Sequence, residues 1–189
     1  LVLLSVGTLV SVLSIGTVAA VAAVLYYSIH STLIAAALFL LADYVAQQRG
    51  TVADRLVSAR PLANPVLLGV LFFLAAIIVI GMPPLSGFVG KIWLLQAATE
   101  DAQRIGLWST LLISSLLVLI ALSRAGSTIF WRVNRQPVLP IQLSKVQLLA
   151  IALLLGASVL LVIMSAPVMQ FCLDAALQLQ ANDIKGGSR

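Results

Sequence analysis

Apolar residues occur along this chain in long runs, and short polar segments separate the runs from one another. The runs cover residues 1–14, 18–46, 64–99, 105–131 and 146–171. A helix needs roughly 20 mainly apolar residues to cross the hydrocarbon core of a bilayer, and every run except the first exceeds this length. The pattern therefore predicts an all-α, polytopic transmembrane helical bundle, followed by a frayed tail at residues 172–189.

The first run is too short to cross a bilayer alone. Leu1 begins directly within apolar sequence, without the basic segment and small-residue cleavage site of a signal peptide. We therefore expect residues 1–14 to continue a helix that starts before Leu1.

Composition and charge agree with a membrane protein. The chain is 61% hydrophobic and 9% charged, whereas soluble domains are about a quarter charged. A net charge of +5 would suggest a nucleic-acid partner in a soluble protein. Here the basic residues lie between apolar runs, where the positive-inside bias accounts for them, so no nucleic-acid partner is expected. Cys172 is the single cysteine, which excludes an intrachain disulfide and a cysteine metal cluster.

The third run is interrupted in its middle by residues that break or open a helix. These residues are Pro83, Pro84, Gly87 and Gly90. The prolines lack N–H groups and free carbonyls one turn earlier, while the glycines let other backbone approach closely. In lipid, the freed carbonyls must bind water, Ser86 or a neighbouring helix. We predict one discontinuous helix broken at residues 83–87, which ends near Gly81–Met82 and resumes near Ser86–Phe88.

Residues 64–99 could form two spans or one broken span, and the charges of the flanking loops separate these alternatives. With one broken span, loops 47–62 and 132–145 lie on the same side of the membrane. That side then gathers the basic residues Arg49, Arg55, Arg60, Arg132, Arg135 and Lys145. With two spans the bias disappears, so the positive-inside rule favours one broken span, with both loops cytoplasmic and the C-terminus external.

Lys91 places a charge inside an apolar run, beside the break. It lies about 8 residues from Thr99, or roughly 12 Å along a helix. A lysine at the bilayer centre costs about 2.5–3.5 kcal/mol on insertion scales, so such residues usually face water or a partner. The favoured interpretation is a protonatable group on an ion path. The alternatives are a lysine that snorkels to the headgroups and a break that is only a proline kink.

His30 lies at a comparable depth in the preceding run. It is about 12 residues from Val18, or roughly 18 Å. Histidine titrates near neutrality and both donates and accepts hydrogen bonds, which suits a proton relay. The alternative is an inter-helix hydrogen bond to Ser31, Thr32 or a tyrosine.

Several further polar residues are candidates for a pathway through the bundle. Thr110 and Ser114 are four residues apart and share a helix face, so they serve either helix packing or a water path. Arg124 and Asp43 are interpreted as interfacial anchors, with an intramembrane role as the alternative. The full set of possible pathway residues is Ser86, Ser31, Thr110, Ser114, Arg124 and Asp43. No catalytic residue, metal site or cofactor is expected.

Three stretches resemble a known family of membrane proteins. GMPPLSGFVGK resembles the broken-helix lysine motif of the proton-pumping membrane subunits of respiratory complex I and the Mrp-type cation/proton antiporters. YYSIHSTLIAAALFLLAD and SRAGSTIFWR are similar to the D subunit of the Mrp antiporters, also called Mnh or Pha. The resemblance covers essentially the whole chain, but only the C-terminal part of such a subunit, whose spans form two inverted repeats.

The resemblance implies roles for two residues and a set of partners. Lys91 matches the family's protonatable lysine, and His30 matches its histidine on the preceding span. Several complex I subunits carry a lysine about one turn after that histidine, but positions 33–35 are Leu, Ile and Ala, so that element is absent. The implied function is a membrane subunit of a multisubunit Na⁺(K⁺)/H⁺ antiporter in the bacterial inner membrane. Its partners would be the other antiporter subunits, the bilayer, Na⁺ or K⁺, and H⁺.

Two other functions stay open. A proton-translocating subunit of complex I or of a membrane-bound hydrogenase would share Lys91 and the break. A structural membrane anchor without an ion path would instead place Lys91 on lipid headgroups or on a fixed carboxylate.

Overall fold

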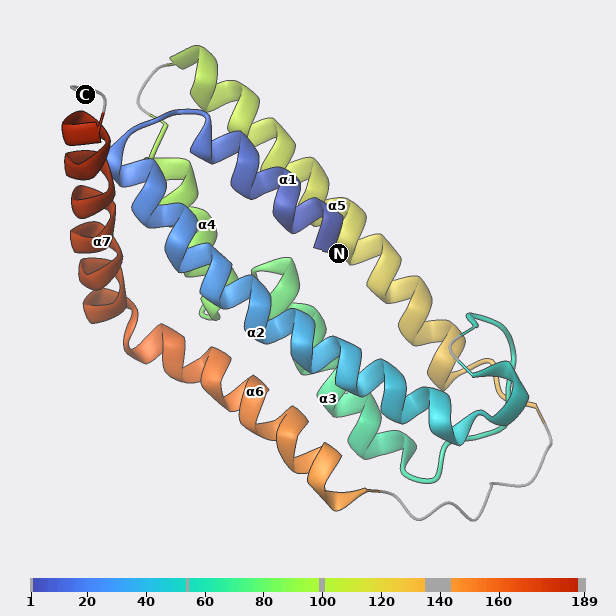
Figure 1. The fold of residues 1–189 in the computed structure, drawn as a ribbon. Helices are drawn as coiled ribbons and strands as arrows, with labels where there is room; N and C mark the ends of the chain where they lie inside the picture. Colours follow the sequence, from blue (N-terminus) through green and yellow to red (C-terminus); the bar gives the residue numbers. More distant parts are fainter. Residues whose placement is uncertain (1, 54, 99–100, 135–143, 187–189) are drawn as a thin grey trace.

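The computed structural model describes residues 2–53, 55–98, 101–134 and 144–186 and is built from helices (Figure 1). In chain order these are α1 (Val2–Leu13), α2 (Val18–Gln48), the short 3₁₀ helix η1 (Gly50–Val52), α3 (Pro65–Ile80), α4 (Ser86–Gln96), α5 (Asp101–Phe130), α6 (Lys145–Ile163) and α7 (Ser165–Gly186). Within the described residues there is no β-strand, only an isolated bridge between Ala59 and Val133. The predicted all-α fold is confirmed.

Within the same residues, three helices are long and apolar enough to cross a membrane: α2, residues 104–130 of α5, and α6. Apolar side chains also cover the outward face of α5, where Leu112 is 65% and Ile105 is 69% exposed. A soluble protein rarely leaves so much contiguous apolar surface uncovered. The chain is therefore a multi-pass membrane protein.

Helix α2 is the centre of the bundle. It contacts α1, α3, α4, α6 and α7, and its 31 residues extend over about 46 Å. Helices α3 and α4 follow one another along α2, and so do α6 and α7 (Figure 1). Together, α3 and α4 cover the length that a single span would cover, and α5 runs back beside α3.

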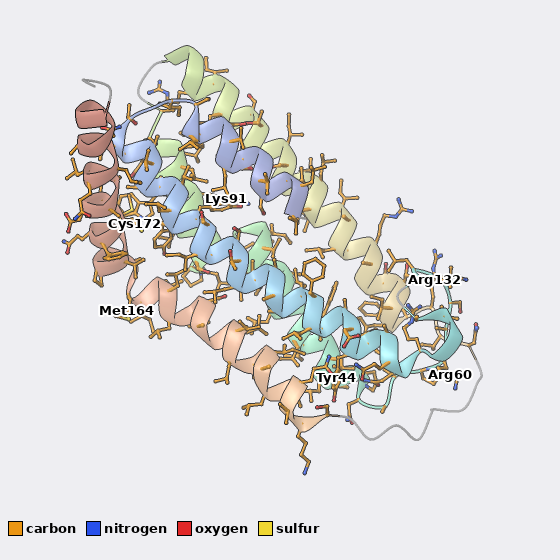
Figure 2. The ribbon with its side chains drawn as sticks, in the orientation of Figure 1. Tyr44, Arg60, Lys91, Arg132, Met164 and Cys172 are labelled. Atoms are coloured by element: carbon orange, nitrogen blue, oxygen red, sulfur yellow. The ribbon has the colours of Figure 1, made fainter. Side chains whose placement is uncertain are left out.

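The segments that follow α2 and α5 meet at one end of the bundle. The N–H of Ala59 donates to Arg132 O at 3.3 Å, and the N–H of Asn134 donates to Ala59 O at 2.7 Å. Arg60 and Arg132 lie at this basic end, which Figure 2 shows beside the end of α2. The arrangement agrees with one broken span between the two loops. The cytoplasmic location of this end stays a prediction, and residues 135–143 of the second loop lie outside the described residues.

Arg49, one of the basic residues of loop 47–62, is buried. Its side chain is only 3% exposed, and its guanidinium donates to the carbonyls of Ala53, Arg55 and Val57. Arg49 therefore fixes the turn that follows α2, because it binds three backbone acceptors that no helix satisfies.

The last apolar run differs from the predicted single span at 146–171. Helix α6 ends at Ile163, and α7 begins at Ser165. Pro167 has no N–H for the carbonyl of Ile163, which explains why the first helix does not continue. Residues 172–186 of the predicted frayed tail are helical, because Cys172 (2% exposed) and Ala176 (0%) pack in a buried cluster with α2.

Candidate functional site

The predicted helix break is confirmed. Helix α3 ends at Ile80, and α4 begins at Ser86. Gly81 has a left-handed φ of 81°, and its N–H and that of Met82 both bind Ile77 O, at 3.2 and 3.1 Å. In an uninterrupted helix the carbonyl of Ile80 would accept from residue 84, which is a proline without an N–H. Ile80 O is therefore released into the interior of the bundle.

The amine of Lys91 donates a hydrogen bond to the carbonyl that the break releases. Its Nζ lies 2.6 Å from Ile80 O and 2.7 Å from Oγ of Ser115 on α5. The hydroxyl of Ser115 in turn donates to Leu111 O at 2.7 Å. The side chain is half-buried and joins α3, α4 and α5, which is not the geometry of a lysine that snorkels to the bilayer surface.

His30 binds the first residue of α4. Its Nδ1 lies 2.9 Å from Oγ of Ser86, and both side chains are almost completely buried, at 1% and 0% exposed. The sequence suggested Ser31, Thr32 or a tyrosine as structural partners instead. The hydroxyls of Ser31 and Thr32 donate to Ser28 O on their own helix, at 3.1 and 2.8 Å. His30 therefore ties α2 to the point where the broken helix resumes.

The glycines of the break permit these contacts, as predicted. A Cβ on Gly87 would lie 2.1 Å from Ile78 O and 3.1 Å from Nε2 of His30. A Cβ on Gly90 would lie 2.9 Å from the ring of Tyr27. Because real Cβ atoms essentially never approach closer than 3.0 Å, the start of α4 packs against α3 and α2 only with glycine at these positions.

Lys91 and His30 approach the same pair of glycines. A Cβ on Gly81 would lie 3.1 Å from Nζ of Lys91, and a Cβ on Gly87 would lie 3.1 Å from both Gly81 Cα and Nε2 of His30. The structure thus brings the two predicted relay residues to one point of the bundle, where the bare backbone of the break lies between them (Figure 2 labels Lys91).

A partly open cavity with a mainly apolar lining reaches His30 from the side of α1. It has a volume of about 450 Å³ and lies between α1 and α2. Among its lining residues, those with polar side-chain atoms are Ser5, Tyr27, Ser28, His30, Ser31 and Thr32. One water takes up about 30 Å³ of liquid, so the cavity has room for several, with hydroxyls to bind them.

Four of the predicted pathway residues lie apart from this site. Thr110 and Ser114 donate to carbonyls of their own helix, Leu107 O and Leu111 O, both at 2.9 Å. Arg124 is exposed. Asp43 is also exposed, and its Oδ2 accepts hydrogen bonds from the side-chain amides of Gln47 and Gln147, both at 2.8 Å.

Sequence reasoning missed Ser115 as a partner of Lys91. The candidates predicted on this run were Thr110 and Ser114. The buried positions Leu111, Val118 and Leu122 show which face of α5 points inward, and Ser115 lies on that face. No periodic pattern marks this face, because α5 is apolar on all sides.

Comparison with known proteins places the chain within a family. Residues 4–121 match the family described as "NADH:quinone oxidoreductase/Mrp antiporter, TM". The D subunit of a probable K⁺/H⁺ antiporter from Rhizobium meliloti is 29% identical over 97% of this chain and 38% of its own length. The D subunit of a Na⁺/H⁺ antiporter from Bacillus subtilis is 35% identical over 67% of this chain and 25% of its own length.

A third relative is also named as the D subunit of a Na⁺/H⁺ antiporter. The D subunit of a Na⁺/H⁺ antiporter from Alkalihalophilus pseudofirmus is 31% identical over 92% of this chain and 35% of its own length. The chain therefore spans about a quarter to two fifths of the length of these relatives. The matches confirm the resemblance to the antiporter D subunits that the motifs indicated. The chain belongs to the NADH:quinone oxidoreductase/Mrp antiporter transmembrane family.

Proposed function

We propose that this chain contributes part of the ion path of a multisubunit antiporter that exchanges Na⁺ or K⁺ for H⁺ across a bacterial inner membrane. Its partners are then the other subunits of that antiporter. The observation that carries the proposal is the contact between Nζ of Lys91 and Ile80 O, the carbonyl that Pro84 leaves without a helical donor. Discontinuous membrane helices with unwound backbone carbonyls are typical of ion sites in transporters, and here such a carbonyl binds a protonatable amine.

Both proposed relay residues are bound to serine hydroxyls. Lys91 contacts Ser115, and His30 contacts Ser86. The hydroxyl of Ser86 can donate or accept, so it can reverse its role when His30 gains or loses a proton. Oγ of Ser115 stays an acceptor, because its hydrogen is donated to Leu111 O and a neutral amine still has N–H groups to donate. Within the described residues, no carboxylate forms an ion pair with Lys91, so loss of its proton leaves no buried anion unpaired. These contacts support a Lys91–His30 relay that stays bonded in both protonation states.

Two observations favour an antiporter over a redox-driven pump. The three relatives compared are each named as the D subunit of a Na⁺/H⁺ or K⁺/H⁺ antiporter. The lysine that several complex I subunits carry after the histidine is absent at positions 33–35. The structural-anchor alternative expects Lys91 on a headgroup or a carboxylate, whereas the amine contacts Ile80 O and Ser115.

The test uses everted membrane vesicles that contain the complete antiporter complex. A pH-sensitive dye reports proton movement when NaCl or KCl is added to vesicles with an imposed pH gradient. Lys91→Ala and Lys91→Arg should both abolish the cation-driven signal, because alanine has no proton to exchange and guanidinium does not release its proton at working pH. His30→Ala should reduce the signal less, because water in the adjacent cavity can bridge the step.

Lys145→Arg is the matched control, because Lys145 is an exposed lysine at the start of α6. It should exchange cations at the wild-type rate, and a native gel confirms assembly of every variant. Wild-type exchange by Lys91→Arg would show that Lys91 is a fixed positive charge, and the relay would be wrong.

A further inference from the structure

A second break in a membrane helix lies between α6 and α7. The backbone hydrogen bonds at this junction run from the N–H of Met164 to Leu160 O at 2.9 Å and from the N–H of Val168 to Met164 O at 3.1 Å. In a continuous helix the N–H of Ser165 would bind Leu161 O. None of the backbone hydrogen bonds described at this junction reaches Leu161 O, so this carbonyl needs a donor from elsewhere in the bundle.

Tyr26 on α2 supplies that donor. Its hydroxyl lies 3.2 Å from Leu161 O, and its side chain is 0% exposed. The surrounding cluster is otherwise apolar or weakly polar and includes Ala22, Met169, Cys172 and Ala176. Tyr26 and Lys91 therefore have equivalent contacts, since each donates a hydrogen bond to a carbonyl released at the end of a helix.

The ring of Tyr26 also lies against the lysine helix. A Cβ on Gly90 would be 3.6 Å from two ring carbons of Tyr26, and Gly90 directly precedes Lys91. His30, one helical turn after Tyr26 on the same face of α2, binds Ser86 at the start of α4. The same face of α2 thus contacts both breaks. Figure 2 shows α2 passing between Lys91 and the α6–α7 junction at Met164.

We propose that Tyr26 is a positioning residue that couples the α6–α7 junction to the position of Lys91. This inference rests on the proposed function, in which Lys91 exchanges its proton. A displacement of Leu161 moves the bound hydroxyl, and the ring passes the movement to the backbone at Gly90, where no side chain intervenes. The position of Nζ relative to Ile80 O then depends on the junction between α6 and α7.

Tyr26→Phe tests the coupling, because it removes the hydroxyl and keeps the ring against Gly90. Hydrogen–deuterium exchange is measured on the purified complete complex. We expect amide exchange to become about tenfold faster in residues 160–168, which lose a bond, and also in residues 86–96, which Tyr26 does not bond. Tyr44→Phe is the matched control, because Tyr44 is 3% exposed on the same helix and no hydrogen bond of its hydroxyl is described; it should leave both segments unchanged.

Faster exchange confined to residues 160–168 would overturn the inference, since Tyr26 would then only cap α6. Pro167→Ala gives an independent test that changes no residue of α2 or α4. It restores an N–H, so α6 and α7 can join, and Ser165 can take Leu161 O from Tyr26. We expect faster exchange in residues 86–96 again, and an unchanged rate there would also refute the coupling.

The transport assay separates this inference from the proposed function. The pH profile of cation-driven proton exchange should be displaced in Tyr26→Phe and not in Tyr44→Phe. If the wild-type complex exchanges no cations, the proposed function fails, while deuterium exchange still decides whether Tyr26 couples the two segments.

Discussion

Gly87→Ala tests whether the broken helix must pack as closely as the structure shows. The added Cβ would lie 2.1 Å from Ile78 O, and real Cβ atoms essentially never come closer than 3.0 Å. The start of α4 must therefore move by at least about 0.9 Å. Such overpacking in a well-packed interior costs about 1–3 kcal/mol.

The same movement affects the neighbouring contact between His30 and Ser86. If Ser86 moves with Gly87 along the line of the bond, the distance grows from 2.9 Å to about 3.8 Å, which is beyond hydrogen-bonding range. A misplacement of about 1 Å at a reacting group can lower a rate about 100-fold. We therefore expect cation-driven proton exchange to fall by about two orders of magnitude in Gly87→Ala.

The assay is the dye signal in everted vesicles, with assembly checked on a native gel. Gly106→Ala in α5 is the matched control, since nothing lies within 4 Å of a Cβ at that position. It should exchange cations at the wild-type rate. If Gly87→Ala does the same while fully assembled, the close approach of α4 to α3 and His30 is not required for transport.

Two further predictions concern the hydroxyl partner of Lys91 and the side of the membrane on which the basic end lies. Ser115→Ala should lower the exchange rate about tenfold, because Lys91 loses one of its two hydrogen-bond partners, whereas Ser114→Ala should have no effect; equal rates for the two variants would remove Ser115 from the site. In a Cys172-free background, Ser58→Cys should react with a thiol reagent only after the membrane is made permeable. Strong labelling in intact cells would place the basic end outside and contradict the single broken span.

The sequence was sufficient to predict the break and its lysine. Consecutive prolines and nearby glycines interrupt an apolar run in a way that few helices tolerate, and a charge within such a run is conspicuous. The partners of Lys91 were not predictable, because the sequence shows that a carbonyl is freed one turn before the prolines but not that α3, α4 and α5 bring Ile80 O and Ser115 to the amine. Sequence spacing gives no measure of that packing.

Two features were not predicted from the sequence, for different physical reasons: Ser115 as the partner of Lys91, and the break between α6 and α7. In a soluble helix the polar face marks the outside, but lipid removes that contrast, so Ser114 and Ser115 are equivalent in sequence. At the α6–α7 junction, Pro167 lies alone in an apolar run without neighbouring glycines. A lone proline can also be accommodated as a kink within one helix, and the groups that complete the break here, Tyr26 and the buried cluster around it, come from a distant part of the sequence.

The hydrogen bonds between Ala59 and the segment after α5 have a mechanical consequence. They close residues 59–134 into a ring that contains α3, α4 and α5. Within that ring, α3 begins shortly after the bonded residue Ala59, whereas α4 is separated from α3 by the non-helical residues 81–85. Because the ring joins the segment before α3 to the segment after α5, these two ends are expected to move together, and a shift between α3 and α4 has to be taken up at residues 81–85.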